Sequence, residues 1–246
     1  MKYAVFFLIA IAAPAQTLHY VINWPSGLSL GEASISVSKP SAAAPSAAKG
    51  ATPAAASVAP SAAAAASGTS SGNWTFDLDI DAGVPGFVLR DHYHSTAQDA
   101  DICSVKLERK TQHGARKSEE TDTFDQTIHT LTRESPGAKT DYSVTPCARD
   151  AMAFLQFARK ELAQGRLAPQ QQVVLGGPYN VRLEVLGVQA VKMLDKTVQA
   201  DRIRATIKSS FSDLVVEIFF AKDEARTPVL AKIPLPLGTF TAELTR

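Results

Sequence analysis

A single stretch of this chain, from Cys147 to Gly165, has the apolar spacing of an amphipathic helix, whereas the rest alternates as short strands do. Its apolar residues recur at the period of a helix that packs one face on a sheet. They are Ala151, Phe154, Leu155, Ala158 and Leu162, with Arg159, Lys160 and Glu161 expected on the opposite face. One helix among many strands predicts a mainly β protein in which that helix covers the sheet.

The ends of this helix carry recognisable signals. Asp150 is the expected N-cap, because its carboxylate can accept hydrogen bonds from the first turn and lies at the positive end of the helix dipole. Gly165 is expected to end the helix, because glycine adopts the left-handed conformation without a Cβ clash. We therefore predict one α-helix at about residues 148–164.

Apolar and polar residues alternate along most of the remaining chain, as in strands that bury one face. The clearest example is Trp74 to Ile80, where Asp77 and Asp79 alternate with the apolar residues. Similar patterns start near residues 18, 33, 87, 103, 124, 179, 203, 214 and 240. About a dozen short strands predict a large curved antiparallel sheet or an incomplete barrel with one covering helix.

The length and charge of the chain limit its organisation and its partners. The 246 residues, 45% of them apolar, are enough for one large β domain with a proper core. The 25 basic residues almost balance the 24 acidic ones, so no global field favours nucleic acid or an anionic membrane as a partner.

The first fifteen residues have the features of an export signal. Lys2 is the charged region, Tyr3 to Ala12 the apolar segment, and Ala13 to Ala15 the small-residue cleavage site. We expect cleavage after Ala15, which leaves a single exported, periplasmic domain at residues 16–246. No later apolar run reaches the roughly 18 residues of a membrane-spanning helix, so an integral membrane protein is not expected.

The two cysteines, Cys103 and Cys147, are expected to form a disulfide. Pairing is favoured in an oxidising compartment, and no Cys-x-x-Cys redox motif is present. The bond would attach the start of the helix to the sheet.

Residues 39–72 interrupt the strand pattern. They are almost entirely Ala, Pro, Ser, Gly and Thr, with Lys39 and Lys49 as the only charges. Four prolines divide the alanines into pieces too short to form a stable helix. We interpret the segment as a disordered insertion between strands; a domain linker is the alternative, but the preceding hairpin is too small to be stable alone.

Three segments in this order resemble an exported bacterial family known as domain of unknown function 3108. They are LHYVINWPSGLSLGEASISVS, DAMAFLQFAR and EIFFAKDEARTPVLAKIPLPLGTFTAEL. The family helix usually has proline after its aspartate, where this chain has Ala151. The resemblance implies a periplasmic β-rich domain similar to the half-barrels of lipoprotein carriers, and it supplies no catalytic residues.

The possible metal and catalytic motifs are better explained structurally. Asp77, Asp79 and Asp81 have the spacing that opens a calcium loop, but Ala82 and Val88 stand where such a loop needs Gly and Glu, so a solvated strand face is expected. His92 and His94 share a strand face; with Asp99 or Asp101 they would make a metal site, but two histidines without further recognisable ligands are expected to be surface residues. No nucleophile elbow, metalloprotease motif or phosphate loop is present, so we expect no enzyme, cofactor or metal.

Two classes of function stay open. A sheet covered by one helix is not expected to fill its concave face, so Phe154 and Phe157 would line a pocket for an apolar ligand such as a lipid. The protein would then be a non-enzymatic periplasmic binding or carrier protein. The alternative is an envelope assembly or scaffolding module that binds another protein through an apolar patch or a free strand edge.

The composition of the insertion leads to a first prediction. Replacing Lys39 to Ser71 with a short glycine-serine turn should change the melting temperature little, because loop-closure entropy depends only weakly on length, about 0.6 kcal/mol per doubling. Thermal unfolding followed by circular dichroism measures this. A large loss of stability would show that the segment packs on the domain.

Overall fold

The computed structural model describes residues 15–39, 72–174, 176–193, 195–209 and 213–246. Within these ranges, fifteen strands form one continuous sheet and α1 (Ala151–Ala163) is the one helix. The first eight strands are β1 (Gln16–Asn23), β2 (Ser29–Ser38), β3 (Trp74–Val84), β4 (Phe87–Ala97), β5 (Ser104–His113), β6 (Arg116–Asp125), β7 (Thr130–Ser135) and β8 (Ala138–Ser143). The others are β9 (Arg149–Asp150), β10 (Gln171–Val174), β11 (Pro178–Met193), β12 (Lys196–Lys208), β13 (Asp213–Ala221), β14 (Pro228–Leu235) and β15 (Gly238–Leu244).

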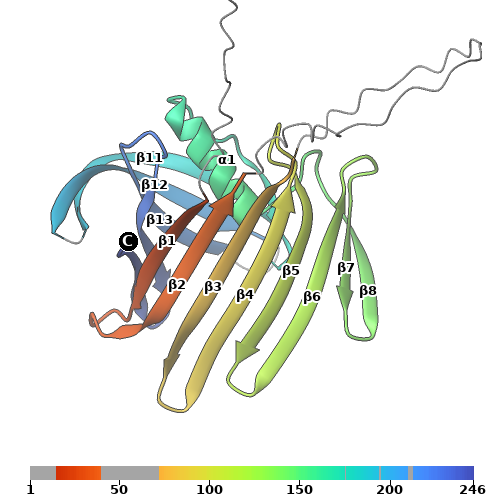
Figure 1. Ribbon diagram of the computed structural model, residues 1–246, viewed down its shortest axis with the longest axis horizontal. Coiled ribbons are helices and arrows are strands. Elements are labelled where there is room, and N and C mark those ends of the chain that lie inside the picture. The colour runs from red at the N-terminus through yellow and green to blue at the C-terminus, as the bar shows by residue number, and fades with distance from the viewer. Residues whose placement is uncertain (1–14, 40–71, 175, 194, 210–212) are drawn as a thin grey trace, which may run out of the picture.

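The order of the strands makes an open, strongly curved sheet. It runs β8-β7-β6-β5-β4-β3-β2-β1-β15-β14-β13-β12-β11-β10-β9. Every neighbouring pair is antiparallel except β9 and β10, which are parallel. In Figure 1, β1–β8 form a broad face, β11–β13 curve round behind it, and α1 lies between the two layers. The predicted mainly β fold, a curved sheet with one covering helix, is confirmed.

The helix is shorter at its N-terminus than predicted. It begins at Ala151 rather than near residue 148, because Arg149 and Asp150 are extended and pair with β10 as the last strand of the sheet. Asp150 is the N-cap, as predicted: its carboxylate accepts hydrogen bonds from the backbone N–H groups of Met152 and Ala153. Gly165 follows the helix with φ +74°, and its N–H donates to the carbonyl of Leu162 at 3.0 Å.

The carboxylate of Asp150 also joins the end of the sheet to its middle. Its Oδ2 atom accepts hydrogen bonds from the hydroxyls of Ser95 on β4 and Ser104 on β5, each at 2.6 Å. The backbone N–H of Ser104 donates to the carbonyl of Ala148 at 3.0 Å. Asp150 itself is fully buried. The last strand is therefore held against β4 and β5, although it does not pair with them as a strand.

The core lies on both sides of the helix. The first turns of α1 pack with β3–β7 through Phe76, Leu107 and Leu131, and its later turns pack with β10–β13 through Val173 and Phe220. A separate cluster under β1 and β11–β15 includes Leu18, Tyr20, Val191, Ala200, Phe219, Ala221, Val229 and Leu244.

The prediction that Arg159 lies on an exposed helix face is wrong. Arg159 is only 5% exposed, because the curved sheet encloses more than one side of α1. Its guanidinium donates to the backbone carbonyl of Ala225 and to the side-chain oxygens of Gln16 and Gln156. Burial lowers the pKa of Arg159 from its ordinary value.

Two predicted segments lie largely outside the described residues: the export signal at residues 1–15 and the insertion at residues 39–72. At the edge of the latter, Lys39 pairs with Asp99 at 3.0 Å and lies over the ring of Trp74. Ser38 pairs with Thr75 across β2 and β3, so the two ends of the insertion meet. In the described part of the chain, no helix has the length and apolar character needed to cross a membrane.

The predicted disulfide joins Cys103, immediately before β5, to Cys147, two residues before β9, with Cα atoms 4.8 Å apart. Because the bond closes a loop with a sequence separation of 44, reduction should destabilise the protein by about 4 kcal/mol in the chain-entropy model. Calorimetry with and without reductant measures the loss, and a Cys103→Ser/Cys147→Ser variant should not respond to reductant. Two freely alkylatable thiols in protein from the periplasm would contradict the pairing.

The buried cap gives another prediction. Asp150→Ala would leave two backbone N–H groups and two serine hydroxyls without this acceptor, so we expect a loss of about 3 kcal/mol or more in the free energy of unfolding. Asp79→Ala is the matched control, because that carboxylate is 60% exposed, and it should change stability by less than about 0.5 kcal/mol. Urea denaturation measures the free energy of unfolding of both variants. If Asp79→Ala and Asp150→Ala lower it equally, Asp150 does not hold β9 against β4 and β5.

Candidate functional site

An apolar cavity of about 200 Å³ lies between α1 and strands β10–β13. Its wall consists of hydrocarbon side chains that α1 and the inner face of the sheet contribute. They are Ala151, Phe154, Leu155, Ala158, Val173, Val181, Leu183, Ile203, Ala205, Ile207, Val216, Ile218 and Phe220. None of these side chains carries a donor, an acceptor or a nucleophile. The cavity is partly open, since Ala151 is exposed and Leu183 is half-buried; it can take up an apolar group, but its lining side chains supply no reactive group.

Strand alternation places these residues on one face. On β12, Ile203, Ala205 and Ile207 point inward together because successive side chains alternate between the two faces of a sheet. On β13, Val216, Ile218 and Phe220 do the same. The helix supplies the opposite wall at positions spaced by three and four residues, which lie on one face of a helix.

The structure places the two predicted ligand-binding residues differently. Phe154 lines the cavity. Phe157 lies outside the set of lining residues, and its ring packs beneath the guanidinium of Arg149, 3.8 Å from the ring centroid. Arg149 is 7% exposed, and burial lowers its pKa. Phe157 thus contacts a buried cation, and it packs against the apolar cluster of Phe154, Ala158 and Val173 without lining the cavity itself.

A second cavity, of about 290 Å³, lies on the other side of Ala151, which lines both. Its lining combines apolar residues of β3–β5, including Leu78 and Leu107, with the polar side chains of Tyr93, Arg109 and Asp150. Burial, and then the nearby carboxylate of Asp91, raise the pKa of Tyr93 to about 12, so its hydroxyl stays protonated at neutral pH.

A buried ionic cluster next to this second cavity was not found from the sequence. Asp122 is fully buried and accepts two hydrogen bonds from Arg133, from Nε at 2.7 Å and from Nη2 at 2.8 Å. Arg109 pairs with Glu120 and lies 3.4 Å from Asp122, while its Nε atom is buried without a partner among the described residues. The alternation of side chains along a strand was an available signal, because residues two positions apart lie on the same face of a sheet. Arg109 is two residues after the buried Leu107, and Asp122 is two residues before the buried Phe124.

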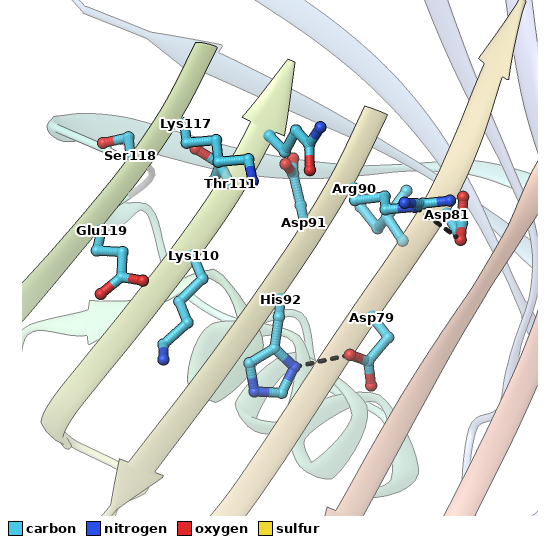
Figure 2. A pocket seen from close by; sticks show the side chains of 12 residues that line it. Asp79, Asp81, Arg90, Asp91, His92, Lys110, Thr111, Lys117, Ser118 and Glu119 are labelled. Carbon is cyan, nitrogen blue, oxygen red and sulfur yellow. Dashed lines mark hydrogen bonds and ion pairs between the residues drawn. The ribbon is translucent and has the colours of Figure 1, made fainter. Parts of the chain in front are cut away.

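The charged residues of β3–β6 line a shallow, open pocket on the face of the sheet away from α1 (Figure 2). His92 pairs with Asp79 at 2.7 Å and His94 with Asp77 at 2.6 Å, each across β3 and β4. Asp81 pairs with Arg90 in the same way. Among the described residues, no group of three or more His, Cys, Asp or Glu side chains is arranged to hold a metal ion. The aspartates form the solvated strand face that the sequence predicts.

Comparison with known structures supports this architecture. The crystal structure titled "Beta-barrel-like Protein of Domain of Unknown Function DUF1849 from Brucella abortus" has a TM-score of 0.61 to this chain, covering 94% of this chain and 96% of that one at 8% identity. At this identity the likeness shows the fold alone. No curated protein matches the chain.

The family comparison agrees with the resemblance seen in the second and third sequence segments, whereas the first, residues 18–38, precedes the matched range. The family model described as "Protein of unknown function (DUF3108)" matches residues 68–245, which include the covering helix and all strands from β3 to β15. The chain belongs to this family.

Proposed function

We propose that this protein is a non-enzymatic, periplasmic binding or carrier protein for an apolar ligand such as a lipid acyl chain, which it holds between α1 and strands β10–β13. The observation that carries the proposal is the cavity of about 200 Å³ with its wholly hydrocarbon lining. Apolar cavities of about 150 Å³ stay dry and take up small apolar molecules. A cavity of this size accommodates part of one acyl chain.

The surroundings of the cavity support an amphipathic ligand. Ala151 lies between the apolar cavity and the second cavity, where Tyr93 and Arg109 offer hydrogen-bond donors. Pockets that combine an apolar wall with a few polar groups are typical of small-molecule sites. The disulfide is consistent with export, because such bonds persist in oxidising compartments.

The alternative is an envelope assembly module. One edge of the sheet is β8, whose outer side has no strand partner among the described residues. However, β8 has only six residues and carries Lys139 and Asp141, and short charged edges oppose pairing with another chain. The apolar cavity is therefore the stronger observation, and the absence of any bound apolar ligand would favour the assembly module.

The test compares two alanines of the same strand, β12. Ala205 lines the cavity, whereas Ala200 is fully buried in a separate core cluster. Ala205→Phe should fill the cavity and abolish uptake of an apolar fluorescent probe with little change in melting temperature. Ala200→Phe should instead destabilise the fold by about 1–3 kcal/mol through overpacking and leave probe binding intact in the folded fraction.

Mass spectrometry of an organic extract completes this test. The unaltered protein should release a copurifying lipid, and Ala205→Phe should release much less. If the unaltered protein carries no lipid and takes up no apolar probe, the carrier proposal is wrong.

A further inference from the structure

Five hairpins turn at the same end of the sheet, here called the hairpin end. The turns between β1 and β2, β3 and β4, β5 and β6, and β7 and β8 lie there because each strand is antiparallel to the next. The turn between β14 and β15 joins them, because β15 is antiparallel to β1. The lower edge of the broad face in Figure 1 shows the turns of β1–β8 together.

Exposed apolar side chains are concentrated at this hairpin end. Six of the ten large hydrophobic side chains that are exposed among the described residues lie in or beside its turns: Leu28, Val84, Phe87, Val88, Leu235 and Leu237. Leu28 and Leu237 are 67% and 71% exposed. At the opposite end, Ile128 is the comparable residue, with 68% of its surface exposed.

Contacts between neighbouring turns join these hairpins in two pairs. The rings of Trp24 and Phe240 are 5.0 Å apart in an edge-to-face arrangement. Gly238 lies so close to Pro25 that a Cβ atom there would be 2.6 Å from Cγ of the proline. The β14–β15 turn therefore packs on the β1–β2 turn. In the same way, the ring of Phe87 in the β3–β4 hairpin lies against Gly114 in the β5–β6 turn.

The charges at this end complement an anionic surface. Residues 24–28, 84–88 and 234–238 contain no charged side chain. The adjoining β5–β6 hairpin contributes Arg116 and Lys117, which are exposed and form no ion pair with the other described residues. By contrast, the β13–β14 turn at the opposite end is strongly polar, with Lys222, Asp223, Glu224 and Arg226.

We propose that the hairpin end docks on an anionic phospholipid bilayer, with the turns containing Leu28, Phe87 and Leu237 inserted among the headgroups and Arg116 and Lys117 bound to lipid phosphates. Apolar side chains flanked by basic ones bind such interfaces by burying apolar area and by attraction to anionic lipids. A bilayer also fits better than strand addition, because hairpin turns offer no free strand edge. This peripheral contact is local and does not depend on the near-zero net charge of the chain.

The experiment is sedimentation of the purified protein with phosphatidylcholine vesicles that contain or lack phosphatidylglycerol. The unaltered protein should bind phosphatidylglycerol vesicles more tightly, and salt should weaken the binding. Leu28→Asp/Leu237→Asp should weaken binding roughly 100-fold or more. Arg116→Gln/Lys117→Gln should weaken it about 30-fold and reduce the preference for phosphatidylglycerol.

The matched control is Ile128→Asp, which changes an equally exposed side chain at the opposite end and should leave vesicle binding unchanged. Melting temperatures check that every variant is folded. If the unaltered protein does not bind phosphatidylglycerol vesicles, or if Ile128→Asp is as damaging as the leucine variant, the proposal is wrong. If the unaltered protein does not bind vesicles but forms dimers, and Leu28→Asp/Leu237→Asp dissociates those dimers, the surface serves self-association instead.

Tryptophan fluorescence gives a second measurement. Trp24 is at the hairpin end, whereas Trp74 lies near the opposite end and donates to the carbonyl of Asp99. Brominated lipid should quench Trp24 in a Trp74→Phe variant and should not quench Trp74 in a Trp24→Phe variant. Ala205→Phe, which fills the cavity, should still bind vesicles, so this proposal and the proposed carrier function can fail separately.

Discussion

The contact between the last strand, β9, and the middle of the sheet depends on the hydrogen bonds that the buried carboxylate of Asp150 accepts. We call this contact the closure of the sheet. The first and last strands, β8 and β9, do not pair, so the backbone ladder leaves the sheet open. Asp150 caps α1 and accepts hydrogen bonds from Ser95 and Ser104 in the middle of the sheet. The disulfide of Cys147 reinforces the same junction. A buried carboxylate with four donors is stable in an apolar interior, whereas one without them would be very unfavourable.

This closure fixes where the interior stays unfilled. With its first residue held at the junction, α1 has to pack on β3–β7 at its start and on β10–β13 further along. A thirteen-residue helix does not fill the space inside so large a sheet, and the apolar cavity beside Phe154 and Ala205 is part of the space that remains, together with the second cavity beside Tyr93. Native cores normally contain few voids larger than a water molecule. A cavity at this position is therefore the feature that most needs a functional explanation.

The two ends of the sheet have different chemistry. The junction end contains the disulfide, the Asp150 network and several charged loops, so it is cross-linked and polar. The hairpin end carries exposed leucines, Phe87 and uncharged turns. The proposed bilayer contact involves the hairpin end, whereas the apolar cavity borders the junction, because its lining residue Ala151 directly follows Asp150.

The sequence by itself determined the strands, the single helix, its Asp150 cap and the Cys103–Cys147 pair, because periodicity, capping and pairing are local or compositional properties. It also led to Phe154, whose place on the apolar helix face follows from spacing. Only the tertiary structure decided that Arg159 is buried, that Phe157 packs beneath Arg149, and that Asp122 forms a buried ionic cluster with Arg109 and Arg133. Those outcomes depend on which side of α1 and which face of each strand the curved sheet encloses. The curvature of the sheet arises from contacts between residues far apart in the chain.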